Sequence, residues 1–175
     1  HVAEWKSAFD DVYRDGREPA AGDFNTAGWT SSYDGLPLPD RDMRVWVDST
    51  VQRILALRPR RVLEIGCGTG LLLSRIAPHC QRYIGVDPST EAIDYVQRCV
   101  VSPRSWPHVT LLCGAADELG LPEDESFDVV VLNSVVQYYP NVAYFRNVLA
   151  NVIGRMTAPG AIFVGDLRSL PLLEM

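Results

Sequence analysis

The sequence predicts an α/β fold in which a doubly wound, mainly parallel sheet is covered by helices. Short apolar segments alternate with segments whose apolar residues recur every three or four positions. Residues 127–132 are almost continuously apolar, as expected of a strand buried on both faces. The joints between segments are short, which favours parallel strands linked by crossover helices. A chain of 175 residues suits one domain.

Composition excludes several classes of function. The net charge is −6 and Lys6 is the only lysine, so a general nucleic-acid-binding face is not expected. No apolar run approaches the length of a membrane span. The four cysteines are scattered, which predicts reduced thiols in a cytoplasmic domain with no metal site. The chain opens on a histidine, so we expect it to be part of a longer protein.

The first 58 residues are expected to form a lid and helices that precede the sheet core at 59–175. Apolar residues at helical spacing predict a short amphipathic helix over residues 2–13. Residues 15–39 are rich in Gly, Pro, Ser and Asn, yet contain Phe24, Trp29 and Tyr33. We interpret this segment as an ordered lid over a site. A surface wrap packed on the core explains the same composition.

Further elements follow from periodicity and from capping residues. The first group comprises a helix capped by Asp40 that ends before Pro59, a strand at 62–65, a helix from 71 to about 77, a strand at 82–86 and a helix capped by Ser89 that runs to 100. The second comprises a loop at 102–108, strands at 109–113 and 127–132, a helix capped by Asn141 that reaches Met156 and ends at Pro159-Gly160, and a strand at 161–164.

A glycine turn follows the first strand. Gly66, Gly68 and Gly70 occupy alternate positions between that strand and the next helix, so a ligand can lie against bare backbone. The dinucleotide fingerprint G-x-G-x-x-G requires a third glycine at position 71, which is Leu71. This disfavours a NAD-dependent oxidoreductase. An ordinary strand-to-helix turn is the structural alternative.

Polar residues stand at the end of each predicted strand. They are Glu64, Asp87, Asp117, Asn133 and Asp166. Because ligands of such sheets bind beyond the carboxyl ends of the strands, we expect these side chains to surround one site. Each acid taken singly is also explained as a favourable charge at a helix N-terminus.

The spacing E-x-G-x-G-x-G at Glu64 to Gly70 resembles motif I of the class I S-adenosylmethionine-dependent methyltransferases, whose fold is Rossmann-like. The resemblance implies S-adenosylmethionine as cofactor and S-adenosylhomocysteine as product. It places Asp87 at the ribose hydroxyls, Asp117 at the adenine edge and Glu64 at the ammonium group. The full set of expected cofactor residues is Trp29, Tyr33, Glu64, Gly66, Cys67, Gly68, Gly70, Asp87, Pro88, Ser89, Ala116, Asp117, Glu118, Asn133 and Ser134.

Four further stretches carry a narrower resemblance. Residues 24–35, 43–46, 132–140 and 165–170 resemble the methyltransferase domains embedded in nonribosomal peptide synthetases, which often interrupt an adenylation domain. The most specific are F-N-x-x-G-W-x-S-S-Y and N-S-V-V-Q-Y. The resemblance implies methylation, most often at the α-amine, of an aminoacyl or peptidyl group that a carrier protein holds on phosphopantetheine. The adjoining adenylation domain is a second implied partner. Trp29 and Tyr33 would close over the sulfonium.

Candidates for positioning the acceptor are Asn133, Gln137, Tyr138 and Asp166, although each also suits a cap or a loop. An aminoacyl amine has a reference pKa of about 7.7 to 8.0, so a strong general base is not required. The alternatives are methylation of a side-chain oxygen or sulfur and a scaffold module without chemistry. The family sheet has seven strands, whereas five are predicted here, so we expect the terminal strands to be missing.

Overall fold

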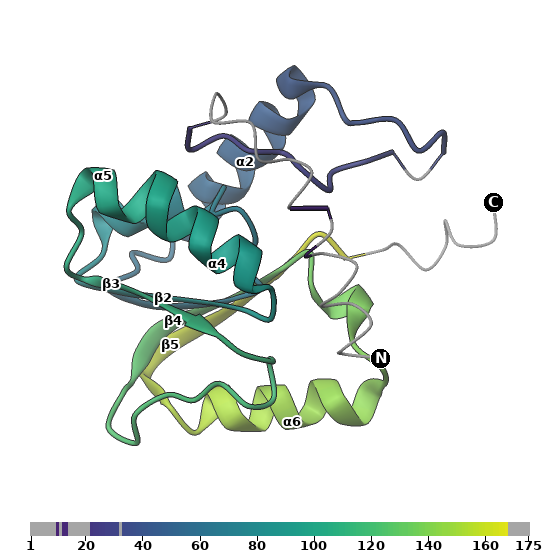
Figure 1. Ribbon diagram of the computed structural model, residues 1–175. Helices are drawn as coiled ribbons and strands as arrows, with labels where there is room; N and C mark the ends of the chain where they lie inside the picture. The colour runs from purple at the N-terminus through teal and green to yellow at the C-terminus, as the bar shows by residue number, and fades with distance from the viewer. Residues whose placement is uncertain (1–9, 11, 14–21, 32, 168–175) are drawn as a thin grey trace.

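The computed structural model describes residues 10, 12–13, 22–31 and 33–167. The predicted helix at 2–13 and the last of the family-like stretches, which runs to residue 170, therefore lie partly outside the described residues. The described elements form three layers, with a sheet between two sets of helices (Figure 1).

The sheet confirms the predicted fold class. Its five strands are all parallel and are ordered β3-β2-β1-β4-β5. The strands are β1 (Arg61–Ile65), β2 (Arg82–Asp87), β3 (Val109–Cys113), β4 (Phe127–Asn133) and β5 (Met156–Gly165). The chain builds outward from β1 to β3 and then crosses back to β4, so the strand order reverses between β1 and β4. Such a reversal opens a crevice at the carboxyl ends of the strands.

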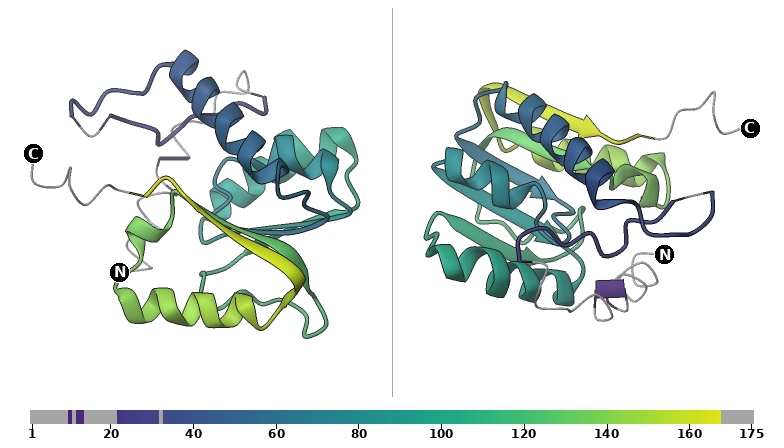
Figure 2. Two further views of the ribbon diagram at one scale, coloured as in Figure 1. Left: turned by 180° about the vertical axis from the view of Figure 1, so that it is seen from behind. Right: turned by 90° about the horizontal axis from the view of Figure 1, so that it is seen from above.

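Helices cover both faces of the sheet (Figures 1 and 2). One face carries α2 (Asp40–Leu55), α3 (Leu73–Ile76), α4 (Thr90–Val96) and α5 (Ser102–Arg104), and the other carries α6 (Val142–Ile153). Alternate strand residues serve the two cores. Val129 and Val131 pack with α2 and α3, whereas Val130 and Leu132 pack towards α6. This alternation explains why the central strands are apolar throughout.

The structure confirms two of the predicted caps and corrects the third. The Ser89 hydroxyl accepts a hydrogen bond from the Ala92 amide, and the Asn141 amide oxygen accepts one from the Tyr144 amide. Asp40, however, is the first residue of α2, and Pro39 precedes it without a side-chain cap. A carboxylate in the first turn still suits the positive end of the helix dipole.

The end of α6 was predicted wrongly. The helix stops at Ile153 with Gly154 as its C-terminal cap, and Met156 already belongs to β5. Pro159 and Gly160 therefore lie inside a ten-residue strand, where the register with β4 shifts between Phe127 and Val129. Proline is tolerated there because β5 is the edge of the described sheet. The predicted loop at 102–108 likewise begins with the short helix α5.

The Asn141 cap generates a test of how α6 is held. Replacing Asn141 by Ala removes the bond to the Tyr144 amide, which measures 2.9 Å. We expect a loss of about 1 kcal/mol in the free energy of unfolding, measured with chemical denaturant. Asn147→Ala is the matched control, because Asn147 is exposed in the middle of α6. Equal stabilities of the two variants would contradict the capping role.

Candidate active site

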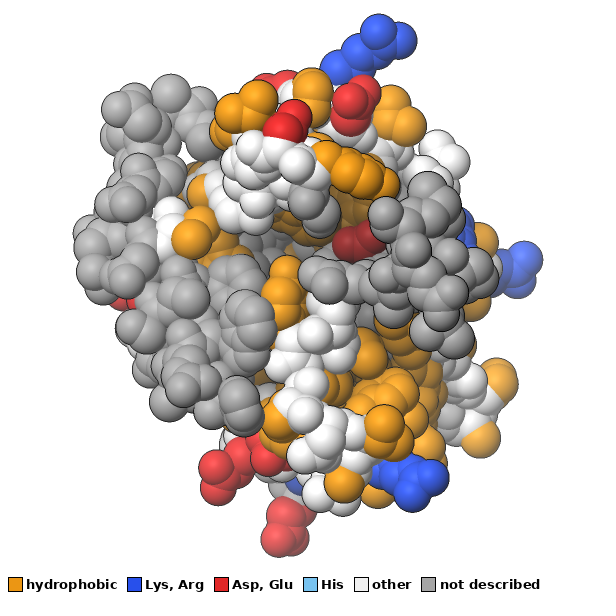
Figure 3. Space-filling view, turned by 90° about the vertical axis from the view of Figure 1, so that its right-hand side faces the viewer, with side chains coloured by type: hydrophobic (Ala, Val, Ile, Leu, Met, Phe, Trp, Pro, Cys, Tyr) orange, Lys and Arg blue, Asp and Glu red, His pale blue; other side chains and the backbone are white. Residues whose placement is uncertain are grey.

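A cavity of about 590 Å³ lies at the carboxyl ends of the strands. A hollow on this side of the molecule is visible in the space-filling view (Figure 3). The strand ends, the glycine turn, the segment after β4 and the lid segment all contribute to its wall. Of the predicted residues it brings together Trp29, Glu64, Gly66, Cys67, Gly68, Asp87, Pro88, Ala116, Asn133, Ser134, Gln137, Tyr138 and Asp166. Tyr33, Gly70, Ser89, Asp117 and Glu118 are not among the residues that line it.

The glycine turn presents bare backbone to the cavity. The Gly66 amide donates to the Val86 carbonyl at 2.7 Å, which ties the turn to the end of β2. Gly66 has a φ of +79°, and a Cβ there would lie 2.1 Å from Val135 Cγ1. Only glycine fits this position. Gly70 serves packing instead, because its Cα faces Val96 of α4.

Glu64 is a buried carboxyl at the end of β1, with 3% of its surface exposed. The Tyr83 hydroxyl of β2 donates a hydrogen bond to Glu64 Oε2 at 2.7 Å. Burial raises the pKa of Glu64 to about 8, although the bond from Tyr83 opposes the shift. The carboxyl is therefore mainly neutral at pH 7. A cation bound beside it would favour the ionised form.

Asp87 is held by two backbone amides at the end of β2. The Gly68 amide donates to one carboxylate oxygen and the Ser89 amide to the other, each at 2.9 Å. Burial raises the pKa of Asp87 to about 6, against the lowering effect of those two hydrogen bonds. Each oxygen keeps a further lone pair, so the carboxylate can accept from two hydroxyl groups of a ligand.

Beyond β3 the wall is formed by Gly114, Ala115 and Ala116 rather than by Asp117. Asp117 was predicted to meet a ligand directly, but its Oδ1 accepts a hydrogen bond from the Tyr144 hydroxyl at 2.7 Å. It is Tyr144 of α6 that lines the cavity. Asp117 therefore orients Tyr144, and Glu118 lies outside the wall.

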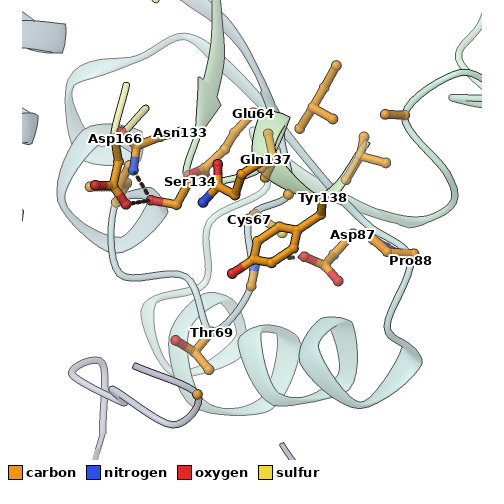
Figure 4. A pocket seen from close by; sticks show the side chains of 18 of the residues that line it. Glu64, Cys67, Thr69, Asp87, Pro88, Asn133, Ser134, Gln137, Tyr138 and Asp166 are labelled. Carbon is orange, nitrogen blue, oxygen red and sulfur yellow. Dashed lines mark hydrogen bonds between the residues drawn. The ribbon is translucent and has the colours of Figure 1, made fainter. Parts of the chain in front are cut away.

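The ends of β4 and β5 are joined by a hydrogen-bonded trio (Figure 4). Asn133 Nδ2 donates to Ser134 Oγ at 3.0 Å, and Ser134 Oγ donates to Asp166 Oδ2 at 2.6 Å. Ser134 and Asp166 both adopt left-handed backbone conformations, with φ of +59° and +54°. Such conformations are costly for residues other than glycine and persist where surrounding contacts enforce them. The trio therefore presents a fixed carboxylate at the cavity.

Two buried polar atoms in the wall have no hydrogen-bond partner in the described part of the chain. They are the Gln137 side-chain oxygen and the Tyr139 hydroxyl. Both residues line the cavity, in the segment that leaves β4. Because an unpaired buried polar atom costs about 1–3 kcal/mol, these two atoms add to the energetic cost of this segment.

The described part of the lid segment contains a short hairpin that is anchored at its base. Leu38 N donates to the Trp29 carbonyl at 3.0 Å, and the Thr69 hydroxyl of the glycine turn donates to the Asn25 carbonyl at 2.6 Å. Trp29 lines the cavity and packs on Trp46, with ring centroids 4.4 Å apart. Tyr33 is 99% exposed at the hairpin tip. Both Trp29 and Tyr33 were expected to close over a ligand, but only Trp29 lines the cavity.

Sequence reasoning missed several residues of the wall, notably Tyr13, Trp46, Tyr139 and Tyr144. Tyr139 belongs to the stretch at 132–140 that had been singled out, so its neighbours carried a signal. Trp46 was assigned to the apolar face of a helix and belongs to the family-like stretch at 43–46, whereas Tyr144 was not singled out. Neither a cluster of three metal-ligating side chains nor a helix suited to cross a membrane occurs among the residues that the structure describes.

Comparison with known proteins places this geometry in context. The family described as methyltransferase domain matches residues 63–163. The chondramide synthase of Chondromyces crocatus is 44% identical over 174 residues, which cover 99% of this chain and 4% of that protein. A probable non-canonical nonribosomal peptide synthetase of Salinispora arenicola is 42% identical over 175 residues, which cover 99% of this chain and 2% of that protein. The chain thus spans a small part of these relatives.

A solved structure shares the fold. The N-methyltransferase NodS from Bradyrhizobium japonicum superposes with a TM-score of 0.62 at 23% identity, covering 76% of this chain and 75% of that one.

The buried Glu64 carboxyl generates a prediction about stability. An unfolded Glu titrates near pH 4.5, whereas burial holds Glu64 protonated until about pH 8. The folded state therefore binds the extra proton, and stability is lost as pH rises through this window. Between pH 6.5 and 8 we expect a decline of up to about 1.4 kcal/mol per pH unit in the free energy of unfolding.

Glu64→Gln should flatten that decline, because the amide keeps the acceptor for Tyr83 but does not titrate. The measurement is denaturant unfolding across this pH range. Glu123→Gln, at an exposed position outside the cavity, is the control and should keep the slope of the unaltered chain. A slope unchanged by Glu64→Gln would contradict a neutral Glu64.

Proposed function

Because this chain belongs to the methyltransferase domains of nonribosomal peptide synthetases, we propose that it methylates the α-amine of an aminoacyl or peptidyl group held as a thioester on a carrier protein. The methyl donor is S-adenosylmethionine. The observation that carries the proposal is a single cavity with two differently equipped ends. The glycine turn, Glu64 and Asp87 form one end, and the Asn133–Ser134–Asp166 trio forms the other.

The first end fits the donor. Gly66 and Gly68 both line the cavity without side chains, so the methionine portion can approach their backbone. Glu64 can receive the ammonium group, and Asp87 has free lone pairs for both ribose hydroxyls. Tyr144, steadied by Asp117, and the small residues 114–116 border the space left for the base.

The second end suits an amine acceptor. When bound, S-adenosylmethionine supplies a methyl group on a sulfonium that is already a strong leaving group. The protein therefore needs to hold a neutral amine in line and to exclude water. Asp166 can accept an N–H of that amine and favours the positive charge that develops on nitrogen. Ser134 keeps the Asp166 carboxylate in place, and Trp29 with Trp46 shields the cavity from the lid side.

The proposal is tested by ligand binding and by product analysis. S-adenosylhomocysteine and NADH are titrated separately into the chain by calorimetry, and we expect binding of the first alone. The chain is then incubated with S-adenosylmethionine and a set of aminoacylated carriers, and fragmentation locates the added methyl group. We expect it on the α-nitrogen. A methyl on a side-chain oxygen or sulfur would replace the amine assignment, and failure to modify any carrier would contradict transfer itself.

A second prediction concerns the acceptor end. Asp166→Asn keeps an acceptor for the Ser134 hydroxyl but removes the negative charge beside the reacting nitrogen. We expect methyl transfer to slow roughly tenfold or more, while the affinity for S-adenosylhomocysteine stays within about twofold. Asp124→Asn is the control, because Asp124 is exposed in the loop between β3 and β4 and outside the cavity. Equal rates in the two variants would refute the role of Asp166.

A further inference from the structure

A second hollow of about 400 Å³ adjoins the cavity, and none of its lining residues comes from the lid segment. Residues of α2 form one wall and the end of β5 forms the other. Trp46, Asn133 and Asp166 line both the hollow and the cavity. The hollow therefore opens onto the acceptor end of the site, at Asn133 and Asp166, and not onto the donor end at Glu64 and Asp87. Figure 2 shows α2 passing beside β5 on this side of the sheet.

The α2 wall carries side chains that suit a polar ligand. Asp42, Ser49 and Arg53 recur on one face of α2, facing the β5 edge, and all three line the hollow. Thr50 is nearly buried and also lines the hollow. Hydroxyl groups placed in this way can bind the amides of a thin chain.

The charges are ordered along the hollow. Arg53 stands at one end, where its guanidinium carbon lies 5.4 Å from the centre of the Phe163 ring. Asp166, a member of the trio, lines both the hollow and the cavity, and Asp42 lines the hollow from the first turn of α2. Asp42 and Arg53 are eleven positions apart on α2, which is about 16 Å of helix at 1.5 Å per residue. A ligand lying here would place an anionic group at Arg53 and an amine at Asp166.

We propose that this hollow, the α2–β5 groove, seats the phosphopantetheine arm of the carrier, with the phosphate at Arg53 and the aminoacyl end at Asp166. This inference rests on the proposed function and adds the route by which the acceptor enters. The arm suits the groove because it is linear, carries amides along its length and ends in a phosphate. Arg53 is exposed, so its contribution is that of a solvated ion pair, about fivefold in affinity.

The test uses two stable mimics, an aminoacyl phosphopantetheine with an amide in place of the thioester and its dephosphorylated counterpart. Each is titrated into the chain with and without S-adenosylhomocysteine, and amide NMR shifts give both the affinity and the contact residues. We expect the phosphorylated arm to bind about fivefold tighter and to shift residues of α2 and β5. Equal affinity for both mimics, or amide NMR shifts confined to elements other than α2 and β5, would contradict the proposed groove.

Variants separate the groove from its surroundings. Arg53→Gln should abolish the preference for the phosphorylated arm, whereas Arg41→Gln, on α2 but outside the groove, should keep it. Ser49→Trp fills the groove and should prevent either arm from binding, whereas Asp48→Trp, exposed elsewhere on α2, should not. All four variants should bind S-adenosylhomocysteine as the unaltered chain does.

The two proposals fail in different ways. Absence of S-adenosylhomocysteine binding would refute the proposed donor. In that case the titrations of the arm in the absence of S-adenosylhomocysteine would still test the groove. Binding of S-adenosylhomocysteine with no binding of either arm would refute the groove alone. An Arg53→Gln chain that keeps the preference for phosphate would do the same.

Discussion

The parallel pairing of β1 with both β2 and β4 is the constraint on which the site depends. Its register sets Ile65 opposite Val86 on one side and Leu132 on the other, so three strands end at the same level. Glu64, Asp87 and Asn133 lie close together only because this register aligns the carboxyl ends of the three strands. A slip of β1 by one residue would turn Glu64 to the opposite face of the sheet and dismantle the donor end.

Several costly features lie around this crevice, although the left-handed residues Arg58 and Ser105 stand elsewhere in the described chain. Glu64 is a buried carboxyl, Ser134 and Asp166 are left-handed, and Gln137 and Tyr139 each bury an unpaired polar atom. Elsewhere the two faces of the described sheet are covered by clusters of buried apolar side chains. Buried carboxyls, left-handed residues and unpaired polar atoms lower stability. Their presence at one crevice indicates function, because a purely structural crevice would not need them.

The sequence predicted the elements whose signals are local. The first four strands, the Ser89 and Asn141 caps and the glycine turn depend on neighbouring residues, and the structure confirms their positions to within a residue. The end of α6 was missed because Pro159 and Gly160 usually stop helices, whereas here they lie in an edge strand. Asp117 and Tyr144 show a deeper limit. They are 27 residues apart, and their hydrogen bond exists only once α6 has packed under the sheet.

The central claim is that the carboxyl end of β1 receives the charged amino-acid end of the methyl donor. Its most direct test is the number of protons released when S-adenosylhomocysteine binds at pH 7, obtained by calorimetry in buffers of different ionisation enthalpy. Burial keeps Glu64 mainly protonated, with a pKa of about 8, so an ammonium group placed beside it should expel close to one proton. Glu64→Gln should release close to none. Tight binding of S-adenosylhomocysteine with no proton release from the unaltered chain would contradict this account.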